Sequence, residues 1–269
     1  MILQVQGNEI FVEDIKPANY KKTIFFIHGW PLSHKVFEYQ YTALAYSGVR
    51  CVSLDLPGYG NSSKLWYGEN YDEMCDIVAK VIRALSLNNI TLLGYSMGGA
   101  LAAKYAAQYN EGNRVTKLIL LSAACPCFIK RQGQPYGMTE DQLDILISNV
   151  LSDKPRAFSD FSKMMFEQPV SPEFKEWFSK ITNQCTVYNA VFGLKALRDE
   201  DLRNILRKID MPTAIFHGVK DRICPVEFAG QMKDSIPNSI YVPFENSGHG
   251  IFYEEKDKLH SEIVKFIND

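Results

Sequence analysis

Ser96 lies in the stretch GYSMGG at residues 94–99, between a run of apolar residues and an alanine-rich run. The first run predicts a β-strand and the second a helix. A serine on a tight strand-to-helix turn, with a glycine two positions to either side, is the arrangement of a nucleophile elbow. The helix N-terminus favours the negative charge that develops when a hydroxyl attacks a carbonyl. The less favoured interpretation is a helix-capping serine beside glycines that serve packing.

A serine hydroxyl is a weak nucleophile at neutral pH and needs a base within hydrogen-bond reach. The chain has five histidines, and four of them fall on expected strands and helices or at their ends: His28, His34, His217 and His260. His249 lies in the turn NSGHG after the last expected strand, from which its imidazole can lean toward Ser96. We therefore expect His249 to be the general base, the alternative being a histidine of a surface loop.

The base needs a carboxylate that holds its tautomer and stabilises the imidazolium. Asp221 follows the strand expected before the last one and precedes His249 by 28 residues, which gives the chain order Ser, Asp, His. Asp55 is the rival, but it begins the Pro-Gly turn DLPGYGNS, where an aspartate commonly bonds its own backbone. We therefore prefer Asp221, although it could also be a surface aspartate paired with Lys220 or Arg222.

Acyl transfer also requires hydrogen-bond donors for the oxyanion of the transition state. The residue after the nucleophile supplies one backbone N–H, which is that of Met97. The second is expected in the turn HGWP at residues 28–31, where Trp30 is the candidate because Pro31 has no N–H. Otherwise HGWP is an ordinary turn that ends a strand.

The elements that must position these residues are visible as short apolar runs alternating with amphipathic stretches. Near-continuous apolar strands alternating with helices predict a mostly parallel sheet of eight strands that is flanked by helices. Gly7 and Asn8 between the first two runs predict an antiparallel hairpin at its edge. Strands are expected at residues 2–6, 9–14, 23–29, 49–55, 90–96, 117–123, 213–218 and 239–244. Helices are expected at residues 34–46, 71–85, 97–109, 226–235 and 254–268.

The alternation is interrupted once, by about 85 residues between the sixth and seventh expected strands. The segment is rich in Phe, Met and Trp and shows helical patterning at 139–151, 155–167, 172–181 and 199–208. A structureless loop of that length is uncommon in a compact domain. The sequence therefore predicts a core formed by residues 1–125 and 211–269, with a helical cap of residues 126–210 inserted after the sixth strand.

Composition limits the classes of function. Of the 269 residues, 46% are hydrophobic and 22% charged, and the net charge of −2 provides no basic surface for a nucleic acid. No signal peptide or membrane-spanning run is recognisable, so no membrane partner is expected. Six scattered cysteines without CxxC pairs indicate reduced thiols in the cytoplasm and no zinc site. The oligomeric state depends on surface patches that a sequence does not define.

Five motifs together resemble the α/β-hydrolase superfamily over essentially the whole chain: the elbow at 94–99, HGWP at 28–31, DLPGYGNS at 55–62, GVKD at 218–221 and SGHG at 247–250. The HGWPLS turn is similar to that of the non-haem haloperoxidase, perhydrolase and arylesterase group, although that group usually has DRRG where this chain has DLPG. The stretch from Ser122 to Phe128 and the cap ending in DLR are similar instead to bacterial carboxylesterases that demethylate pimeloyl-carrier-protein esters.

The resemblance implies a serine esterase that acts on a small ester through an acyl-enzyme, without metal or organic cofactor. The alternatives are perhydrolysis or haloperoxidase activity by the same residues, carbon–carbon bond hydrolysis, and a non-catalytic receptor for a small molecule. Relatives that open epoxides or remove halide carry aspartate in place of Ser96, which disfavours those reactions. Among the apolar residues of the cap region, we expect Phe128, Phe161 and Trp177 to contact substrate, while most of the others form the core of the cap.

Overall fold

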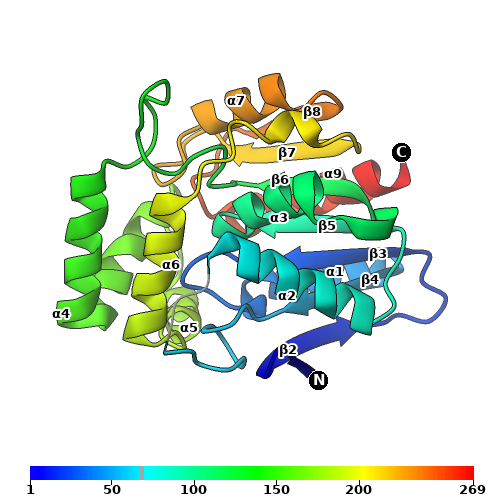
Figure 1. Cartoon of the computed structure of the whole chain (residues 1–269), viewed down its shortest axis with the longest axis horizontal. Helices are drawn as coiled ribbons and strands as arrows, with labels where there is room; N and C mark the ends of the chain where they lie inside the picture. The colour runs from blue at the N-terminus through cyan, green and yellow to red at the C-terminus, as the bar shows by residue number, and fades with distance from the viewer. Residues whose placement is uncertain (67–69) are drawn as a thin grey trace.

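The computed structural model describes residues 1–66 and 70–269 and contains one sheet of eight strands. The strand order is β1-β2-β4-β3-β5-β6-β7-β8. The pairs β1–β2 and β2–β4 are antiparallel and the others are parallel, which confirms the expected mostly parallel sheet (Figure 1). The strands are β1 (Ile2–Val5), β2 (Asn8–Ile15), β3 (Lys22–Ile27), β4 (Val49–Leu54), β5 (Ile90–Tyr95), β6 (Val115–Leu121), β7 (Thr213–Gly218) and β8 (Ser239–Phe244).

The edge hairpin was predicted correctly, but its turn lies one residue earlier than expected. Asn8 pairs with Val5, so the two turn residues are Gln6 and Gly7. Both have positive φ angles, 51° and 78°. A two-residue turn with two positive φ angles matches the twist of the flanking strands, and Gly7 adopts this conformation without steric cost.

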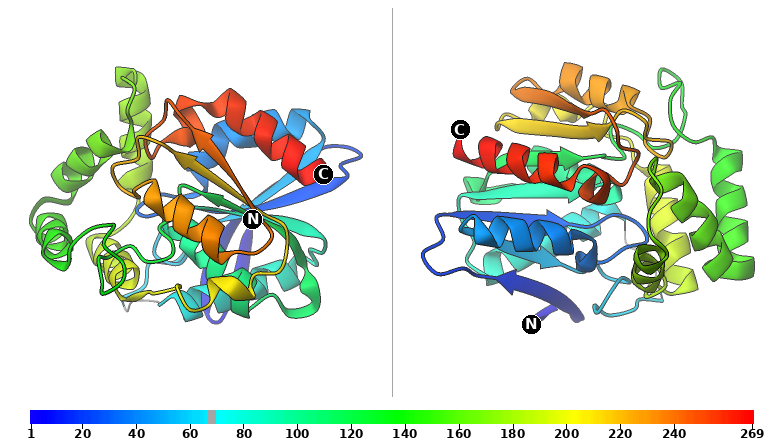
Figure 2. Two further views of the ribbon diagram at one scale, coloured as in Figure 1. Left: turned by 90° about the horizontal axis from the view of Figure 1, so that it is seen from above. Right: turned by 180° about the vertical axis from the view of Figure 1, so that it is seen from behind.

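Helices cover both faces of the sheet (Figure 2). One face carries α1, α8 and α9, and the other carries α2, α3 and α7. Because helices pack on both sides, every residue of the central strand β5 is buried, which explains its continuous apolar sequence. The bounds are η1 (His34–Phe37), α1 (Glu38–Tyr46), α2 (Tyr71–Ala84), α3 (Met97–Gln108), η2 (Glu111–Asn113), α7 (Glu227–Ser235), α8 (Ile251–Glu254) and α9 (Lys256–Asn268).

Three further helices stand over the carboxyl ends of the strands, at the left of Figure 1: α4 (Glu140–Met165), α5 (Pro172–Thr182) and α6 (Val187–Asp199). Helix α4 is interrupted at Asp153, which has a non-helical φ of −150° and precedes Lys154-Pro155. The Asp153 carboxylate accepts a bond from the N–H of Arg156 and so caps the second half. This interruption corresponds to the two separate helices predicted at 139–151 and 155–167. The proposed domain boundaries at 126 and 210 stay a prediction.

The expected helix at 199–208 is wrong. The helix lies earlier, in α6, where the Thr186 hydroxyl caps it by accepting from the N–H of Asn189. The Val, Asn and Gly residues of α6 have low helix propensity, so packing and capping rather than propensity determine that a helix forms here. Beyond it, Leu202 donates its N–H to the carbonyl of Pro126 and Arg203 binds Asp201, and both bonds hold the segment as turns before η3 (Leu206–Lys208).

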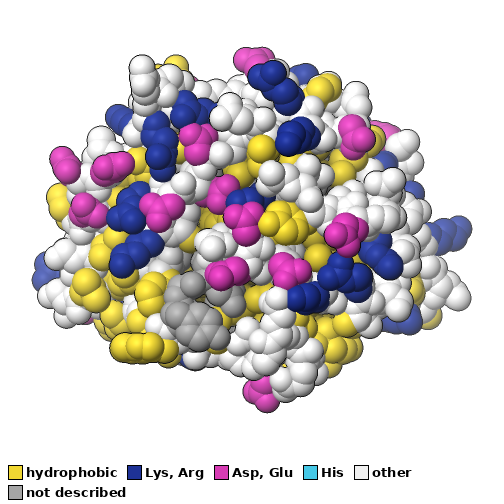
Figure 3. Space-filling model, in the orientation of Figure 1, with side chains coloured by type: hydrophobic (Ala, Val, Ile, Leu, Met, Phe, Trp, Pro, Cys, Tyr) yellow, Lys and Arg dark blue, Asp and Glu magenta, His cyan; other side chains and the backbone are white. Residues whose placement is uncertain are grey.

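The surface carries both signs of charge. On the face shown in Figure 3, lysine and arginine side chains are interspersed with aspartate and glutamate. Within the part of the chain that the structure describes, no helix is both long and apolar enough to cross a membrane. All six cysteines are buried and unpaired.

Candidate active site

The turn around Ser96 joins β5 to α3 at the carboxyl edge of the sheet. Ser96 has φ 56° and ψ −120°, a strained conformation for a residue with a side chain. A Cβ atom at Gly94 would overlap the backbone of Gly98, and one at Gly98 would overlap the carbonyls of Ile27 and His28. Glycine is therefore required at both positions, as the GYSMGG pattern predicts.

The three residues expected to act together are brought together. His249 Nε2 lies 2.9 Å from Ser96 Oγ, and His249 Nδ1 lies 2.7 Å from Asp221 Oδ2. All three residues are buried: the exposed fraction is 8% for Ser96, 1% for His249 and 8% for Asp221. A carboxylate only accepts hydrogen bonds, so Nδ1 carries the proton and Nε2 presents its lone pair to the serine hydroxyl. This is the geometry in which an imidazole can remove the serine proton.

The carboxylate of Asp221 is fixed by its own turn. Its Oδ1 accepts hydrogen bonds from the backbone N–H groups of Ile223 and Cys224, at 2.8 and 2.9 Å. Oδ2 is thereby directed at the imidazole of His249.

His217 is a residue of this site that the sequence reasoning missed. Its Nε2 donates to the carbonyl of Cys224 at 2.8 Å and lies 3.5 Å from Asp221 Oδ2. Burial lowers the pKa of His217, which keeps the ring neutral. The ring holds the turn of Asp221 against the end of β7. The sequence feature that could have indicated this role is that His217 precedes Asp221 by only four residues.

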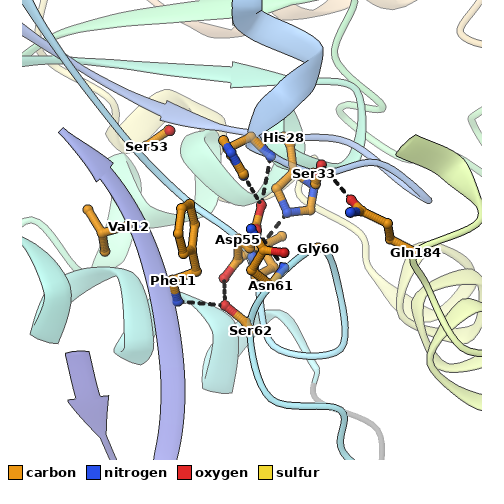
Figure 4. Close-up of polar contacts among 12 residues, drawn as sticks. Phe11, Val12, His28, Ser33, Ser53, Asp55, Gly60, Asn61, Ser62 and Gln184 are labelled. Atoms are coloured by element: carbon orange, nitrogen blue, oxygen red, sulfur yellow. Dashed lines mark hydrogen bonds and ion pairs between the residues drawn. The ribbon is translucent and has the colours of Figure 1, made fainter. Parts of the chain in front are cut away.

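Asp55 lies in a different network, shown in Figure 4. Its carboxylate accepts bonds from the His34 ring at 2.8 Å, the His34 N–H at 2.7 Å and the Asn61 N–H at 2.7 Å. Burial by itself would raise the pKa of Asp55, but these hydrogen bonds hold it below its ordinary value. The residue is wholly buried and joins the turns at 28–34 and 55–62, as a structural aspartate would.

The HGWP turn runs directly against the elbow. A Cβ atom at Gly29 would lie 2.8 Å from the Cβ of Ser96. In the part of the chain described, the backbone N–H groups of Trp30 and Met97 have no hydrogen-bond acceptor. Met97 is the first residue of α3, where an N–H has no partner within the helix. Two free donors beside a serine hydroxyl are what an oxyanion site requires.

His28 anchors the HGWP turn. Its Nδ1–H donates to the carbonyl of Gly29 at 2.9 Å, and its Nε2 accepts from the N–H of Leu56 at 3.0 Å. The ring is fully buried, and burial lowers the pKa of His28 from 6.5 to about 4. A neutral imidazole is needed here because Nε2 must accept a hydrogen bond.

This pKa shift predicts a loss of stability in acid. The unfolded chain binds a proton at His28 near pH 6.5, whereas the folded chain does so only near pH 4. The contribution of His28 is therefore complete above pH 6.5 and falls by about 3 kcal/mol as the pH drops to 4. The variant His28→Gln should have a shallower decline in the free energy of unfolding, measured by urea denaturation from pH 7 to 4. Parallel curves for the two proteins would contradict the shift.

The three cap-region residues expected to contact substrate lie in different surroundings. Phe161 packs edge-on against the Trp30 ring at 5.1 Å and lines a cleft of about 790 Å³ that also includes Ile223. Trp177 instead contacts Phe174 and Tyr39 and lines a separate depression. Phe128 is buried. Phe161 therefore adjoins the HGWP turn.

Comparison with known proteins agrees with this architecture. A family model described as alpha/beta hydrolase fold matches residues 22–256. The chain belongs to the α/β-hydrolase family. It is 49% identical to the AB hydrolase superfamily protein YisY of Bacillus subtilis, over 96% of this chain and 95% of the relative. It is 30% identical to the non-heme chloroperoxidase CPO-A1 of Kitasatospora aureofaciens, over 97% of both chains.

A solved structure of an esterase from Exiguobacterium antarcticum superimposes with a TM-score of 0.96. The two sequences are 39% identical, and the match covers 100% of this chain and 99% of the esterase. The expected resemblance to hydrolases of the esterase and haloperoxidase groups is thus confirmed.

Proposed function

We propose that this hydrolase cleaves a small carboxylic ester, with Ser96 as nucleophile, His249 as general base and Asp221 as the acid that orients it. The observation that carries the proposal is the hydrogen-bonded row from Ser96 through His249 to Asp221 at the carboxyl edge of the sheet. The two free N–H groups beside it, those of Trp30 and Met97, are the proposed oxyanion donors.

In the proposed reaction, Ser96 Oγ attacks the ester carbonyl carbon while His249 Nε2 takes the hydroxyl proton. The resulting oxyanion accepts hydrogen bonds from Trp30 and Met97. The intermediate collapses as the alkoxide leaves with the proton from His249, and the acyl group remains on Ser96. Water, activated by the same imidazole, then releases the acid. Asp221 stays ionised throughout. The steps use these three side chains, the two backbone N–H groups and water.

Hydrolysis of p-nitrophenyl acetate by the purified chain, together with labelling by a fluorophosphonate, tests the proposal. We expect turnover and one label per chain, located at Ser96 by peptide mass analysis. A folded protein that shows neither turnover nor labelling would instead favour a non-catalytic receptor.

Perhydrolysis is a second candidate, which the similarity to a non-heme chloroperoxidase favours. Hydrogen peroxide would replace water in the attack on the acyl-enzyme, so that the acyl group leaves as a peracid and Ser96 regains its proton. Peracid formation from acetate and hydrogen peroxide measures this activity. It should disappear together with ester hydrolysis when Ser96 is replaced.

We expect acyl-chain preference to depend on Phe161, because its ring adjoins Trp30 and a cleft between α4 and the turn of Asp221. Phe161→Leu should shift the preferred acyl length, since one methylene in such a pocket changes discrimination by about 1 to 3 kcal/mol. The measurement is kcat/KM over a chain-length series of p-nitrophenyl esters, with the fluorophosphonate labelling rate as a check on Ser96. Trp177→Leu is the matched comparison and should leave the profile unchanged. Identical profiles for wild type and Phe161→Leu would place the acyl pocket elsewhere.

A further inference from the structure

The end of the cap helix α4 lies between the two loops that carry Asp221 and His249. The carbonyl of Met165 accepts from the N–H of Gly250 at 2.8 Å, and the carbonyl of Phe166 accepts from the side chain of Arg222 at 3.0 Å. Gly250 follows His249 and Arg222 follows Asp221 in the chain. Residues 165–168, which we call the brace segment, therefore contact the base loop and the acid loop at once.

Glu254, the last residue of α8, joins the brace segment to the histidine loop with a single carboxylate. Its Oε1 accepts from the backbone N–H groups of Glu167 and Gln168, both at 2.7 Å. Its Oε2 accepts from the backbone N–H of Gly248 at 2.8 Å. Hydrogen bonds from N–H groups to a carboxylate are shorter and stronger than those between neutral groups. One side chain thus connects the cap backbone to the residue before His249.

The neighbouring carboxylate makes a useful contrast. Glu255 accepts from the N–H of Asn246 at 3.0 Å and from the hydroxyl of Ser247 at 2.6 Å. Both partners belong to the histidine loop itself. Two adjacent glutamates therefore hold the same loop, but of these hydrogen bonds only those of Glu254 reach the cap.

The brace segment is also tied to the acid loop through charge. The carboxylate of Glu167 lies 3.8 Å from Lys220 Nζ and 3.7 Å from Arg222 Nη2, on either side of Asp221. A shift of the brace segment would consequently be transmitted to the loops of both Asp221 and His249.

We propose that Glu254 is a positioning residue, which fastens the cap to the histidine loop and so keeps the His249 imidazole aligned between Ser96 and Asp221. The inference rests on the proposed hydrolytic function of Ser96. It assigns to the cap a part in holding the base, beyond any contact with substrate.

Replacing Glu254 with glutamine tests this with little change of shape. An amide has one oxygen, so its NH₂ group must face either the Gly248 N–H or the N–H pair of Glu167 and Gln168. On that side, N–H donors then face each other, and the hydrogen bonds to Glu254 are lost there. A displacement of catalytic groups by about 1 Å costs on the order of a hundredfold in rate. We expect kcat for p-nitrophenyl acetate and the labelling rate of Ser96 to fall together by about tenfold to a hundredfold, with KM changed less than about twofold.

Two comparisons separate positioning from general damage. Glu262→Gln removes the same charge from α9 and should behave like wild type. Glu255→Gln should reduce the labelling rate less than Glu254→Gln does. Thermal melting of each variant shows whether it is folded. A merely structural role would lower the melting temperature of Glu254→Gln while the folded protein still labelled at the wild-type rate.

Failure of this inference can be told apart from failure of the proposed function. If wild type is neither labelled nor active, the assignment of Ser96 is wrong. If wild type is labelled and folded Glu254→Gln is labelled equally fast, Glu254 has no positioning role and the inference alone is overturned. Equal losses in Glu254→Gln and Glu255→Gln would likewise overturn it, since the loop would then need anchoring but not the cap.

Discussion

Ser96→Ala is expected to abolish ester hydrolysis, with kcat lowered on the order of 10⁴- to 10⁶-fold. The change removes the one oxygen that can attack the carbonyl, while the backbone of the elbow and the pair of His249 and Asp221 stay in place. Alanine differs from serine only in lacking Oγ, so it tolerates the strained φ at this position as well as serine does. The measurements are p-nitrophenyl acetate turnover, fluorophosphonate labelling, and thermal melting as a check of the fold.

Ser122→Ala is the matched control. Ser122 is also a buried serine with a positive φ, at the end of the neighbouring strand β6, and its hydroxyl has no hydrogen-bond partner among the residues described. This variant should keep both turnover and labelling. Loss of activity in the Ser122 variant, or wild-type turnover in Ser96→Ala, would disprove the assignment of the nucleophile.

The sheet was predictable because parallel strands that are buried on both faces leave a strong sequence pattern. All eight strands were expected, and the order of the candidate residues followed from the ends of those strands. The elbow was equally clear, since the close approach of Gly94 and Gly98 to other backbone excludes any side chain there. The strands depend on burial along one segment, and the elbow depends on backbone approaching so closely that only glycine fits, including the backbone of Ile27 and His28 at Gly98. A sequence records the first as an apolar run and the second as a fixed glycine.

The features that the sequence did not reveal depend on helix capping and on contacts between distant segments. The start of α6 depends on the Thr186 cap. The place of α6 in the fold depends on its packing against the HGWP turn, where the Trp30 indole N–H donates to the Ala190 carbonyl. The direction in which Trp177 points depends on how α5 lies against Tyr39 of α1. The hydrophobic character of both segments predicted that they are packed, but it did not predict which parts of the fold they pack against.

The choice between the two aspartates shows the same distinction. Asp55 and Asp221 each lie beside a buried histidine, with ring-to-carboxylate distances of 2.8 and 2.7 Å. The sequence favoured Asp221 because Asp55 lies in a Pro-Gly turn and because Asp221 gives the chain order Ser, Asp, His. In the structure, the difference is that His249 also reaches Ser96, whereas the ring of His34 packs against the tilted ring of Phe11, with the centroids 4.7 Å apart. A buried histidine–aspartate pair is therefore not by itself evidence of catalysis.

Asp221→Asn should lower the acylation rate by about 10⁴-fold, because the surrounding donors dictate how the amide is oriented. The N–H groups of Ile223 and Cys224 point at Oδ1, so the amide oxygen must take that position. The NH₂ group then faces His249 Nδ1, which has to accept the hydrogen bond and give up its proton. The proton moves to Nε2, where it points at Ser96 and leaves no lone pair to remove the serine proton.

Asp55→Asn is the matched variant and should act on stability rather than on the chemical step. Its amide would disturb the bonds from His34 and Asn61 and lower the free energy of unfolding by about 1 to 3 kcal/mol, while folded protein keeps its acylation rate. Pre-steady-state release of p-nitrophenol gives the acylation rate, and urea denaturation gives the stability. Near-normal acylation in Asp221→Asn, with a collapse in folded Asp55→Asn, would transfer the role of the acid to Asp55. Retention of acylation in both variants would mean that His249 works without either carboxylate.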